Sequence, residues 1–440
     1  MFVNPFLVKI YKGNETILVS LLGGGIQLIP SEISQVLFTN PSLLPERYIT
    51  HFKDSEILFD NSDRFYNIFN SFKNKSFTKT ELEPLNVIFT LTYSCNFSCS
   101  YCFQLRQKNP IGDKIISFDF IENAKEIVSQ LEAFGNYPKG LSKIYLYGGE
   151  PLRNEPHLLK IVDKLLDTFT PSNQIFITTN GYDLNHYKPI LERYSNLNIQ
   201  VTIDGPKFIQ DKKRRAKDKG SSFDKILSNL KFVKSLNHNI MIRINVGEDN
   251  YLYILDLMNE LRDYNIFTDE DLPKHIYLAP VTNRESEEIN IAFYKAFIDY
   301  YFEYLFRYKI RVSNIRPLDY AIKVAEGETI TPSKFYCDAI YGKYIIDPIG
   351  NIGICEEAVL NENQFVGNID KEGKVAIKEN PWKDRTVEDM SECINCEYRY
   401  MCSGGCPWKA SNCTRNYKSA MCDGFKEIFE YSILKLLGEK

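Results

Sequence analysis

Several kinds of segment are missing from this 440-residue sequence, and each absence excludes a class of protein. No run of about 18 apolar residues occurs, so no membrane-spanning helix is expected. Residues 1–6 lack a basic region followed by a long apolar core, so the sequence predicts no signal peptide and a cytoplasmic location. The formal net charge of −4 offers no basic surface for nucleic acid. The five histidines are scattered, and none is assigned a catalytic role.

Cysteine is absent from the long middle of the chain, residues 103–336, although the whole chain contains 11. Three cysteines lie within residues 95–102, and the other eight follow residue 336. Because thiols stay reduced in the cytoplasm, this number indicates metal sites rather than disulfides. The distribution predicts two metal-binding regions on either side of a metal-free scaffold.

The first metal-binding region is a loop with the spacing C-x3-C-x2-C, formed by Cys95, Cys99 and Cys102 after the apolar run 86–91. Three thiolates on a tight loop can hold three corners of a cubic iron–sulfur cluster and leave the fourth iron without a protein ligand. A zinc site is the alternative, but zinc-binding pairs are usually C-x2-C with a second pair following. No second pair follows closely here.

The middle of the chain alternates between strand patterns and helix patterns, which indicates parallel strands with right-handed crossovers. Strands are expected at 86–92, 143–148, 174–179, 198–204, 239–246 and 276–281, and helices at 118–133, 157–169, 223–236, 251–264 and 291–306. Six such units predict an α/β fold with a partial, open (β/α)6 TIM-like barrel over residues 85–312. Chemistry in such barrels sits at the C-terminal ends of the strands, so we expect the cysteine loop and the motifs after later strands to converge on one rim.

One of these motifs is Gly148-Gly149-Glu150-Pro151, which follows the second expected strand. Glycines let the backbone approach a ligand closely. Together with the cysteine loop, this motif resembles the radical SAM enzymes, in which the open iron chelates S-adenosylmethionine (SAM) and the glycine segment binds the amino group of its methionine part. The resemblance implies that the remaining cofactor contacts are Tyr101 and Phe103 beside the adenine, Asn180 at the third strand end, and Thr202 and Arg214 on the carboxylate and ribose. For Arg214, which lies in the charged run 211–219, a solvated loop is the alternative.

The eight C-terminal cysteines are the second metal-binding region, and they resemble the SPASM domain, which holds two auxiliary 4Fe–4S clusters. The resemblance implies a cysteine-rich domain with a C-terminal helix over residues 313–440 and three 4Fe–4S clusters in all. It assigns Cys337, Cys355 and Cys406 to the nearer auxiliary cluster. It assigns the remaining set to the distal cluster: Cys393, Cys396, Cys402 and Cys422. The fourth position of the nearer cluster is either Cys413 or an open iron, and a structural zinc module is the alternative to both clusters.

The activity that this resemblance implies is reductive cleavage of SAM to a 5′-deoxyadenosyl radical, which then takes a hydrogen atom from the substrate. The expected substrate is a ribosomally made precursor peptide or protein, oxidatively cross-linked through a thioether or carbon–carbon bond. An external flavodoxin-like or ferredoxin-like protein is the expected electron donor. The alternatives are an enzyme like the anaerobic sulfatase maturases, which forms formylglycine, and a non-catalytic iron–sulfur electron carrier or regulator. Glu356 matches the position of the proposed general base in the sulfatase maturases.

Residues 1–84 precede the barrel and are expected to form a small α+β module. Strand patterns at 6–11 and 16–20 precede a helix that Ser31 is expected to cap. The module resembles, weakly, the winged-helix elements that bind leader peptides in peptide-maturation enzymes. A plain cap on the barrel is the alternative.

Overall fold

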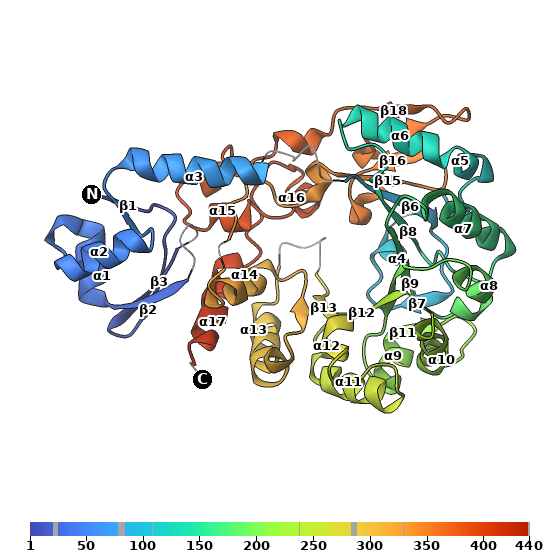
Figure 1. The fold of residues 1–440 in the computed structure, drawn as a ribbon, viewed down its shortest axis with the longest axis horizontal. Helices are drawn as coiled ribbons and strands as arrows, with labels where there is room; N and C mark the ends of the chain where they lie inside the picture. Colours follow the sequence, from blue (N-terminus) through green and yellow to red (C-terminus); the bar gives the residue numbers. More distant parts are fainter. Residues whose placement is uncertain are drawn as a thin grey trace.

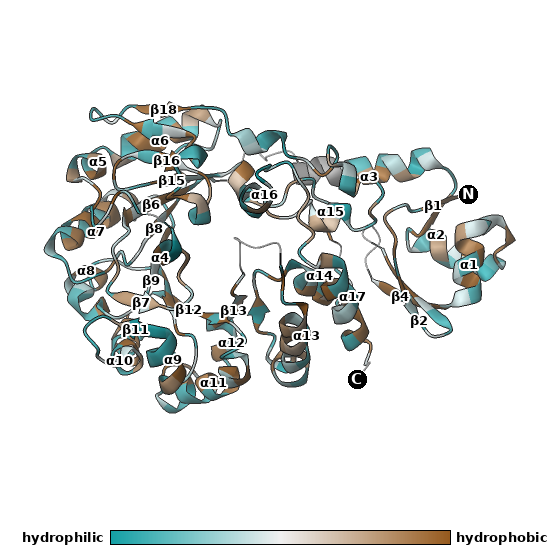
Figure 2. Ribbon diagram, turned by 180° about the vertical axis from the view of Figure 1, so that it is seen from behind, coloured by the Kyte–Doolittle hydropathy of each residue, from teal (hydrophilic) through white to brown (hydrophobic). Residues whose placement is uncertain are grey.

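The computed structural model describes residues 1–20, 25–77, 84–107, 109–236, 238–282, 288–328 and 330–438, with the backbone only for residues 72–77. Figure 1 shows three parts in a row: the N-terminal module at one end, the barrel at the other, and the C-terminal part between them. Figure 2 shows the same order from behind, and the helices around the barrel carry both hydrophilic and hydrophobic residues. Helices that bury one face and expose the other have this mixed composition.

The described strands of the main sheet are β6 (Asn86–Thr92), β8 (Lys143–Gly148), β9 (Ile175–Thr179), β10 (Asn198–Thr202), β12 (Asn239–Val246), β13 (Ile276–Pro280), β14 (Arg311–Val312), β15 (Lys343–Ile346), β16 (Asn351–Gly353), β17 (Gly367–Ile369) and β18 (Val375–Ile377). Their order in the sheet is β14-β13-β12-β10-β9-β8-β6-β15-β16-β17-β18. Pairs from β14 to β15 are parallel, and pairs from β15 to β18 are antiparallel. The six expected strands are all present in the parallel part, so the predicted partial barrel is confirmed.

The short helix α4 (Phe103–Arg106) follows the cysteine loop and lines the cavity at the strand ends. Helices cover the outside of this sheet, and they are α5 (Phe118–Glu122), α6 (Ala124–Phe134), α7 (Pro156–Phe169), α8 (Lys188–Leu191), α9 (Lys207–Lys213), α10 (Ser222–Lys234), α11 (Ile254–Asp263), α12 (Leu272–His275) and α13 (Ile291–Tyr300). Three of the expected helices differ in detail. The helix expected over 251–264 begins as a 3-10 turn at Tyr251–Tyr253 and becomes α-helical at Ile254. The helix expected over 118–133 is divided at Asn123, whose backbone leaves the helical region. The helix expected over 291–306 ends as α13, and a π-helical segment and a 3-10 turn follow it until Lys309 takes a left-handed conformation.

The N-terminal module consists of β1 (Phe2–Val3), β2 (Val8–Lys12), β3 (Glu15–Val19), β4 (Ile26–Pro30), α1 (Ser31–Thr39), α2 (Glu46–Asp54), β5 (Leu58–Phe59) and α3 (Ser62–Phe77). The three strands β2, β3 and β4 form an antiparallel sheet, and helices follow them. The expectation that Ser31 caps the first helix is wrong. Ser31 is the first helical residue, and Pro30 at the cap position has no side chain that could accept a hydrogen bond.

The buried face of the N-terminal module packs against the C-terminal part of the chain. One hydrophobic cluster joins Phe6 and Phe69 of the module to Tyr400 and Phe429. The Tyr400 ring lies 4.9 Å from the Phe6 ring and 4.9 Å from the Phe69 ring, measured between ring centres, and both contacts are edge-on. These aromatic contacts fix the module beside the C-terminal cysteines, at a distance from the barrel (Figure 1).

The C-terminal part contains four helices between short 3-10 turns and irregular segments, and they are α14 (Arg316–Ala325), α15 (Arg399–Cys402), α16 (Pro407–Thr414) and α17 (Phe425–Leu436). Its strand β15 pairs in parallel with β6, with Ile345 opposite Ile88, so one sheet contains strands from both residues 85–312 and residues 313–440. This pairing carries the cysteine-rich part to the barrel rim. Among the described residues, no helix is both long enough and apolar enough to cross a membrane.

Candidate active site

The cysteine loop begins directly after β6, at the C-terminal edge of the parallel strands. Its middle is β7 (Phe97–Cys99), which pairs antiparallel with β11 (Arg214–Ala216) and sets Cys99 opposite Arg214. The backbone N–H of Phe97 donates to the sulfur of Cys95 at 3.3 Å. Backbone pairing therefore holds the loop, and all three of its thiols line one cavity.

The environment of these thiols disfavours the thiolate form as long as no metal is bound. Burial, together with the charge of the nearby Glu150, raises the pKa of Cys95 to about 12. Burial also raises the pKa of Cys99, against the effect of Arg214. The charge of Cys102 acts on Cys99, so the three groups are electrostatic neighbours. Metal binding requires thiolates, and a cluster with positively charged irons removes the cost of ionising them here. The donor set therefore fits a three-thiolate iron–sulfur cluster.

The glycine motif packs backbone against backbone on the cysteine loop. The N–H of Gly149 donates to the Thr92 carbonyl at 2.8 Å, and the N–H of Glu150 donates to the Ser94 carbonyl at 3.1 Å. A methyl group at Gly149 would overlap the Ser94 carbonyl oxygen. Gly148 and Gly149 line the same cavity as the thiols, whereas Pro151 is buried behind it. The motif needs glycine here because the two chain segments touch.

Glu150 is 1% exposed, and its carboxylate is already engaged within the protein. It accepts hydrogen bonds from the N–H of Leu152 at 2.9 Å, the hydroxyl of Thr179 at 2.6 Å and the N–H of Asn180 at 2.6 Å. Burial raises the pKa of Glu150 to about 7 in spite of these bonds. This side chain joins the loop after β8 to the end of β9. The neighbouring Asn180 places its amide nitrogen 3.9 Å from the sulfur of Cys95.

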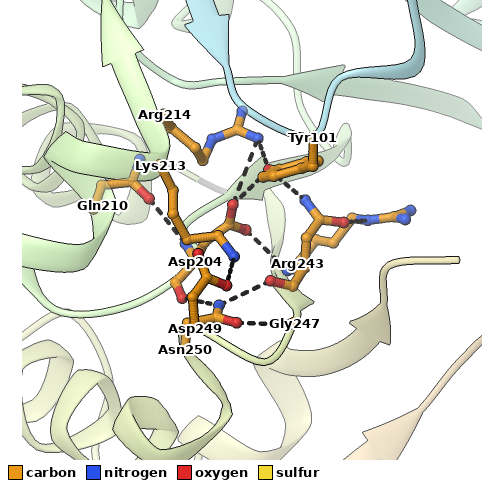
Figure 3. A network of polar contacts seen from close by, with 10 residues as sticks. Tyr101, Asp204, Gln210, Lys213, Arg214, Arg243, Gly247, Asp249 and Asn250 are labelled. Carbon is orange, nitrogen blue, oxygen red and sulfur yellow. Dashed lines mark hydrogen bonds and ion pairs between the residues drawn. The ribbon is translucent and has the colours of Figure 1, made fainter. Parts of the chain in front are cut away.

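Tyr101 belongs to a polar network around Asp204 that the sequence did not reveal (Figure 3). Its hydroxyl donates to Asp204 Oδ2 at 2.5 Å and accepts from Arg214 Nη1 at 2.5 Å and from Asn245 Nδ2 at 2.9 Å. Asp204 is fully buried, and Asn250 donates to its carbonyl oxygen at 2.5 Å. The only signal for Asp204 and Asn245 in the sequence was their position where the fourth and fifth strands end.

Arg214 is 8% exposed, so it is not part of a solvated loop, although it lies in a charged stretch of sequence. Its own burial acts to lower its pKa, but the charges of Cys99, Tyr101 and Asp204 raise that pKa above its usual value. The arginine is therefore a permanent cation beside the cysteine loop. Phe103 begins α4, and its ring and Thr202 line the same cavity.

A single cavity of about 1400 Å³ contacts both cysteine regions. On the barrel side it is lined by the three loop thiols and by every expected cofactor residue except Pro151. On the other side it is lined by Cys337, Cys355, Cys406 and Trp408. A second cavity of about 760 Å³ borders Cys402 and Cys422 and shares Arg316 with the first.

The C-terminal cysteines form two electrostatic groups. Burial raises the pKa of Cys337 to about 11 and also raises that of Cys355, and Cys406 acts on both. The second group is linked in the same way and consists of Cys393, Cys396, Cys402 and Cys422. Cys413 lies on α16, seven residues after Cys406, and does not line the large cavity.

No three His, Cys, Asp or Glu side chains in the described ranges lie close enough together to bind one metal ion. A cubane binds each thiolate at a different iron, so its ligands spread more widely than those of a single ion. The grouping of the cysteines is therefore compatible with clusters as the bound groups.

Glu356 lies directly after Cys355 and faces the cavity. Lys343 donates to its two carboxylate oxygens at 3.1 and 3.0 Å, and the same lysine pairs with Asp338 at 2.9 Å. Burial acts to lower the pKa of Lys343, but Glu356 and Asp338 raise it above its usual value. The carboxylate of Glu356 thus has a fixed cation beside it.

The part of the chain that forms this site matches a known protein family. Residues 89–261 match the model of the Radical SAM superfamily. Residues 89–261 therefore form a radical SAM domain. The superfamily implies a 4Fe–4S cluster and SAM, and the cysteine loop fits both. The prediction of an enzyme is confirmed.

Two curated relatives match more than three quarters of this chain. A cysteine-type anaerobic sulfatase-maturating enzyme of Clostridium novyi is 24% identical over 364 residues, which cover 78% of this chain and 93% of the relative. The radical SAM cyclopropyl synthase TigE of Paramaledivibacter caminithermalis is 24% identical over 429 residues, covering 87% of this chain and 84% of the relative.

Solved structures with the same fold include SPASM-domain enzymes. Native anSMEcpe with bound AdoMet and a peptide has a TM-score of 0.59 at 18% identity, over 81% of this chain and 98% of that chain. SuiB of Streptococcus suis bound to the precursor peptide SuiA has a TM-score of 0.53 at 14% identity, over 95% of this chain and 98% of that chain. These likenesses establish the fold of the enzyme.

Proposed function

We propose that this radical SAM enzyme oxidatively modifies a ribosomally made peptide with the help of two auxiliary 4Fe–4S clusters in a SPASM domain over residues 313–440. Cross-linking through a thioether or carbon–carbon bond is the proposed modification. A small flavodoxin-like or ferredoxin-like protein is the proposed source of electrons.

The observation that carries this proposal is the shared cavity of about 1400 Å³. Its barrel wall contains Cys95, Cys99 and Cys102, and its opposite wall contains the thiols of the nearer auxiliary group. A side chain held between the two walls would have the site of hydrogen abstraction on one side and an electron acceptor on the other. The adjoining cavity of about 760 Å³ provides a path through which an extended peptide could enter.

The proposed cofactor residues divide into two roles. Gly148, Gly149, Tyr101, Phe103 and Thr202 line the cavity and would contact SAM directly. The others act mainly by positioning. Glu150 and Asn180 join strand ends to the cysteine loop, and Arg214 holds the hydroxyl of Tyr101.

When bound, the SAM cluster supplies one electron that cleaves SAM to methionine and the radical that abstracts hydrogen. The protein's own contribution is to orient the substrate and to exclude water from the site. Tyr147 and Trp408, which border the cavity and are mostly or fully covered, give it apolar walls on both sides. The Tyr101 network keeps the cysteine loop rigid, because Asp204 and Asn245 fix the tyrosine from two further strands.

The auxiliary ligands are proposed as the two electrostatic groups described above, with the fourth position of the nearer cluster filled by Cys413 or by a group of the substrate. Removing the Cys413 thiol separates these possibilities. If Cys413 is a ligand, Cys413→Ala lowers the stability of the nearer cluster and its spectrum changes without peptide. If a substrate group is the ligand, Cys413→Ala keeps about 12 Fe per chain and the spectrum changes only when peptide is added.

Residues 1–84 are proposed as the element that recognises the leader part of the peptide. The match to anSMEcpe covers 81% of this chain, and the match to SuiB bound to the precursor peptide SuiA covers 95%. The module's sheet ends in β4, whose Leu28 is 47% exposed. An extended peptide can add to such an exposed edge.

Anaerobic reconstitution with a candidate precursor peptide tests the proposed function. Mass spectrometry should show a loss of two hydrogens per modified site, and iron analysis should give about 12 Fe per chain. An unchanged mass with solvent deuterium incorporated would indicate epimerisation instead. About 4 Fe together with bound zinc would contradict the two auxiliary clusters.

Formylglycine formation is the second candidate, and the position of Glu356 on the cavity favours it. A base is needed to take a proton as the substrate side chain is oxidised to an aldehyde. Glu356→Gln should then reduce turnover by roughly 10²–10⁴-fold with a sulfatase-derived peptide. If the enzyme forms a thioether, the same substitution should leave turnover nearly unchanged, because cluster-bound thiolate needs no base. Lys343→Met, which removes the neighbouring cation, serves as the control for a purely structural effect.

A further inference from the structure

Arg385 is a buried cation whose role the reaction does not explain. Its side chain is 1% exposed, and no carboxylate of the described residues forms an ion pair with it. Within the described part of the chain, its nitrogens donate only to backbone carbonyls: those of Gly404 at 2.7 Å, Gly405 at 2.9 Å, Ser419 at 2.9 Å and Tyr417. Other buried cations of this enzyme have a carboxylate partner, as Lys409 has in Asp423 and Arg214 in Asp204.

The four carbonyls belong to two segments that carry cysteines. Gly404 and Gly405 lie between Cys402 and Cys406, and Tyr417 and Ser419 lie in the segment that leads to Cys422. Gly404 and Gly405 both have left-handed backbones, with φ of 71° and 73°, so an L side chain would be strained there. A methyl group at Gly405 would also overlap the Met421 carbonyl oxygen. The chain is thus shaped to turn these carbonyls toward one guanidinium.

Thiols of both auxiliary cysteine groups act electrostatically on Arg385. Burial lowers the pKa of Arg385, and the thiols that oppose this effect are Cys406, Cys337, Cys393 and Cys402. The first two belong to the nearer group and the last two to the distal group. A buried guanidinium without an anion is strongly unfavourable, and carbonyl dipoles compensate it only in part. Cluster-bound thiolates would supply the missing negative charge from both sides.

We propose that Arg385 is a fixed positive charge between the two auxiliary clusters and that it raises the reduction potential of both. This inference rests on the proposed two-cluster site. A thiolate-bound cubane gains negative charge when it takes up an electron, so a nearby cation stabilises the reduced form more than the oxidised form. Such a charge outside the ligand set makes each cluster a better electron acceptor. A guanidinium suits this position because it stays charged at every pH at which proteins fold.

Two substitutions separate the charge from the hydrogen bonds. Arg385→Gln removes the charge, and Arg385→Lys keeps it but loses most of the four bonds. Both full-length variants are reconstituted anaerobically, their iron is counted, and each cluster is followed by redox titration with electron paramagnetic resonance. In Arg385→Gln both auxiliary midpoint potentials should move to more negative values. Arg385→Lys should stay close to the wild type, and the SAM cluster, bound by the barrel loop, is the internal control.

Each other outcome has a definite meaning. Unchanged auxiliary potentials in an iron-replete Arg385→Gln variant would overturn the inference and leave the proposed function intact. Equal shifts in both variants would show that the bonds, not the charge, matter. If Arg385→Gln loses auxiliary iron, retention of about 12 Fe in Arg385→Lys supports the charge requirement, and loss in both overturns it. A wild type with only about 4 Fe would instead contradict the two-cluster site itself.

Discussion

The two cysteine regions border the same cavity but are held in place by different interactions. The barrel loop is fixed by regular structure: β7 pairs with β11, and the glycine motif packs on the loop backbone. The C-terminal cysteines lie on 3-10 turns, short helices and irregular chain, around a guanidinium that binds four carbonyls. In the second region only Cys355, two residues after β16, lies next to a strand of the main sheet.

This difference has a thermodynamic consequence. A sheet that forms from hydrophobic strands sets the loop ligands near their final positions before any cluster arrives. Where ligands lie on irregular chain, the free energy of binding the metal is also free energy of folding. We therefore expect the barrel to fold without iron and the C-terminal part to depend on it.

The largest expected effect comes from removing one cysteine set at a time. The triple variant Cys95→Ala, Cys99→Ala, Cys102→Ala should lose all SAM cleavage and retain about 8 Fe on the C-terminal cysteines. The variant Cys337→Ala, Cys355→Ala should still cleave SAM but no longer modify the peptide. Chromatography of 5′-deoxyadenosine and iron analysis measure both. Loss of SAM cleavage in the second variant would contradict the separation of roles.

Removing the iron with a chelator should have the second-largest effect. Stripped of iron, the chain should be cut by protease within residues 313–440 before the barrel is cut, because the C-terminal part loses its metal-binding free energy. Mass spectrometry of the fragments locates the cuts. Simultaneous cleavage of both parts would show that the barrel also needs its cluster to fold.

Glycine substitutions should give smaller and distinct defects in the two regions. Gly149→Ala would push against Ser94 and displace the cysteine loop, lowering SAM cleavage by roughly 10–100-fold. Gly405→Ala would overlap Met421 and destabilise the C-terminal part by about 1–3 kcal/mol, measured by denaturant unfolding. Gly353→Ala, whose added methyl group would approach atoms no closer than 4.0 Å, is the control. Equal defects in all three variants would contradict an effect of overlap.

The smallest expected effect is the pH dependence of barrel stability through His238, which lies far from either cysteine region in sequence. Burial lowers the pKa of His238 from its usual 6.5, although the carbonyl of Leu191 opposes the shift. The unfolded chain then binds the proton more readily than the folded chain. With respect to His238, the free energy of unfolding is therefore highest above pH 6.5 and falls as the pH drops below 6.5. Unfolding of His238→Gln should lack this decline. A decline of equal size in the variant would assign it to other groups.

Much of the barrel could be predicted from the local pattern of apolar residues in the sequence. The strand β6 was expected at its observed bounds, and so were β8 and β12, because buried parallel strands are continuous apolar runs between helices. The rule that chemistry lies at the C-terminal strand ends placed the cysteine loop and the glycine motif together. Their contacts were predictable because both motifs follow adjacent strands.

Other features depended on contacts between distant residues. Nothing near Lys343 in the sequence shows that β15 joins β6, about 250 residues earlier, and so brings the auxiliary cysteines to the cavity. Arg385 lies beside Lys383 and Asp384, where a surface position is the natural expectation. Tyr101 was expected beside the adenine, but only the fold shows that its hydroxyl binds Asp204 and Asn245.

The sequence by itself determined the kind of chemistry, because thiol spacing and a two-glycine turn are local requirements of the cluster and of close backbone contact. Tertiary structure alone decided the geometry: which thiols face one cavity, which charges are buried between them, and where the N-terminal module packs. The physical reason is that burial and pairing depend on neighbours in space, and those neighbours lie up to several hundred residues apart in this chain.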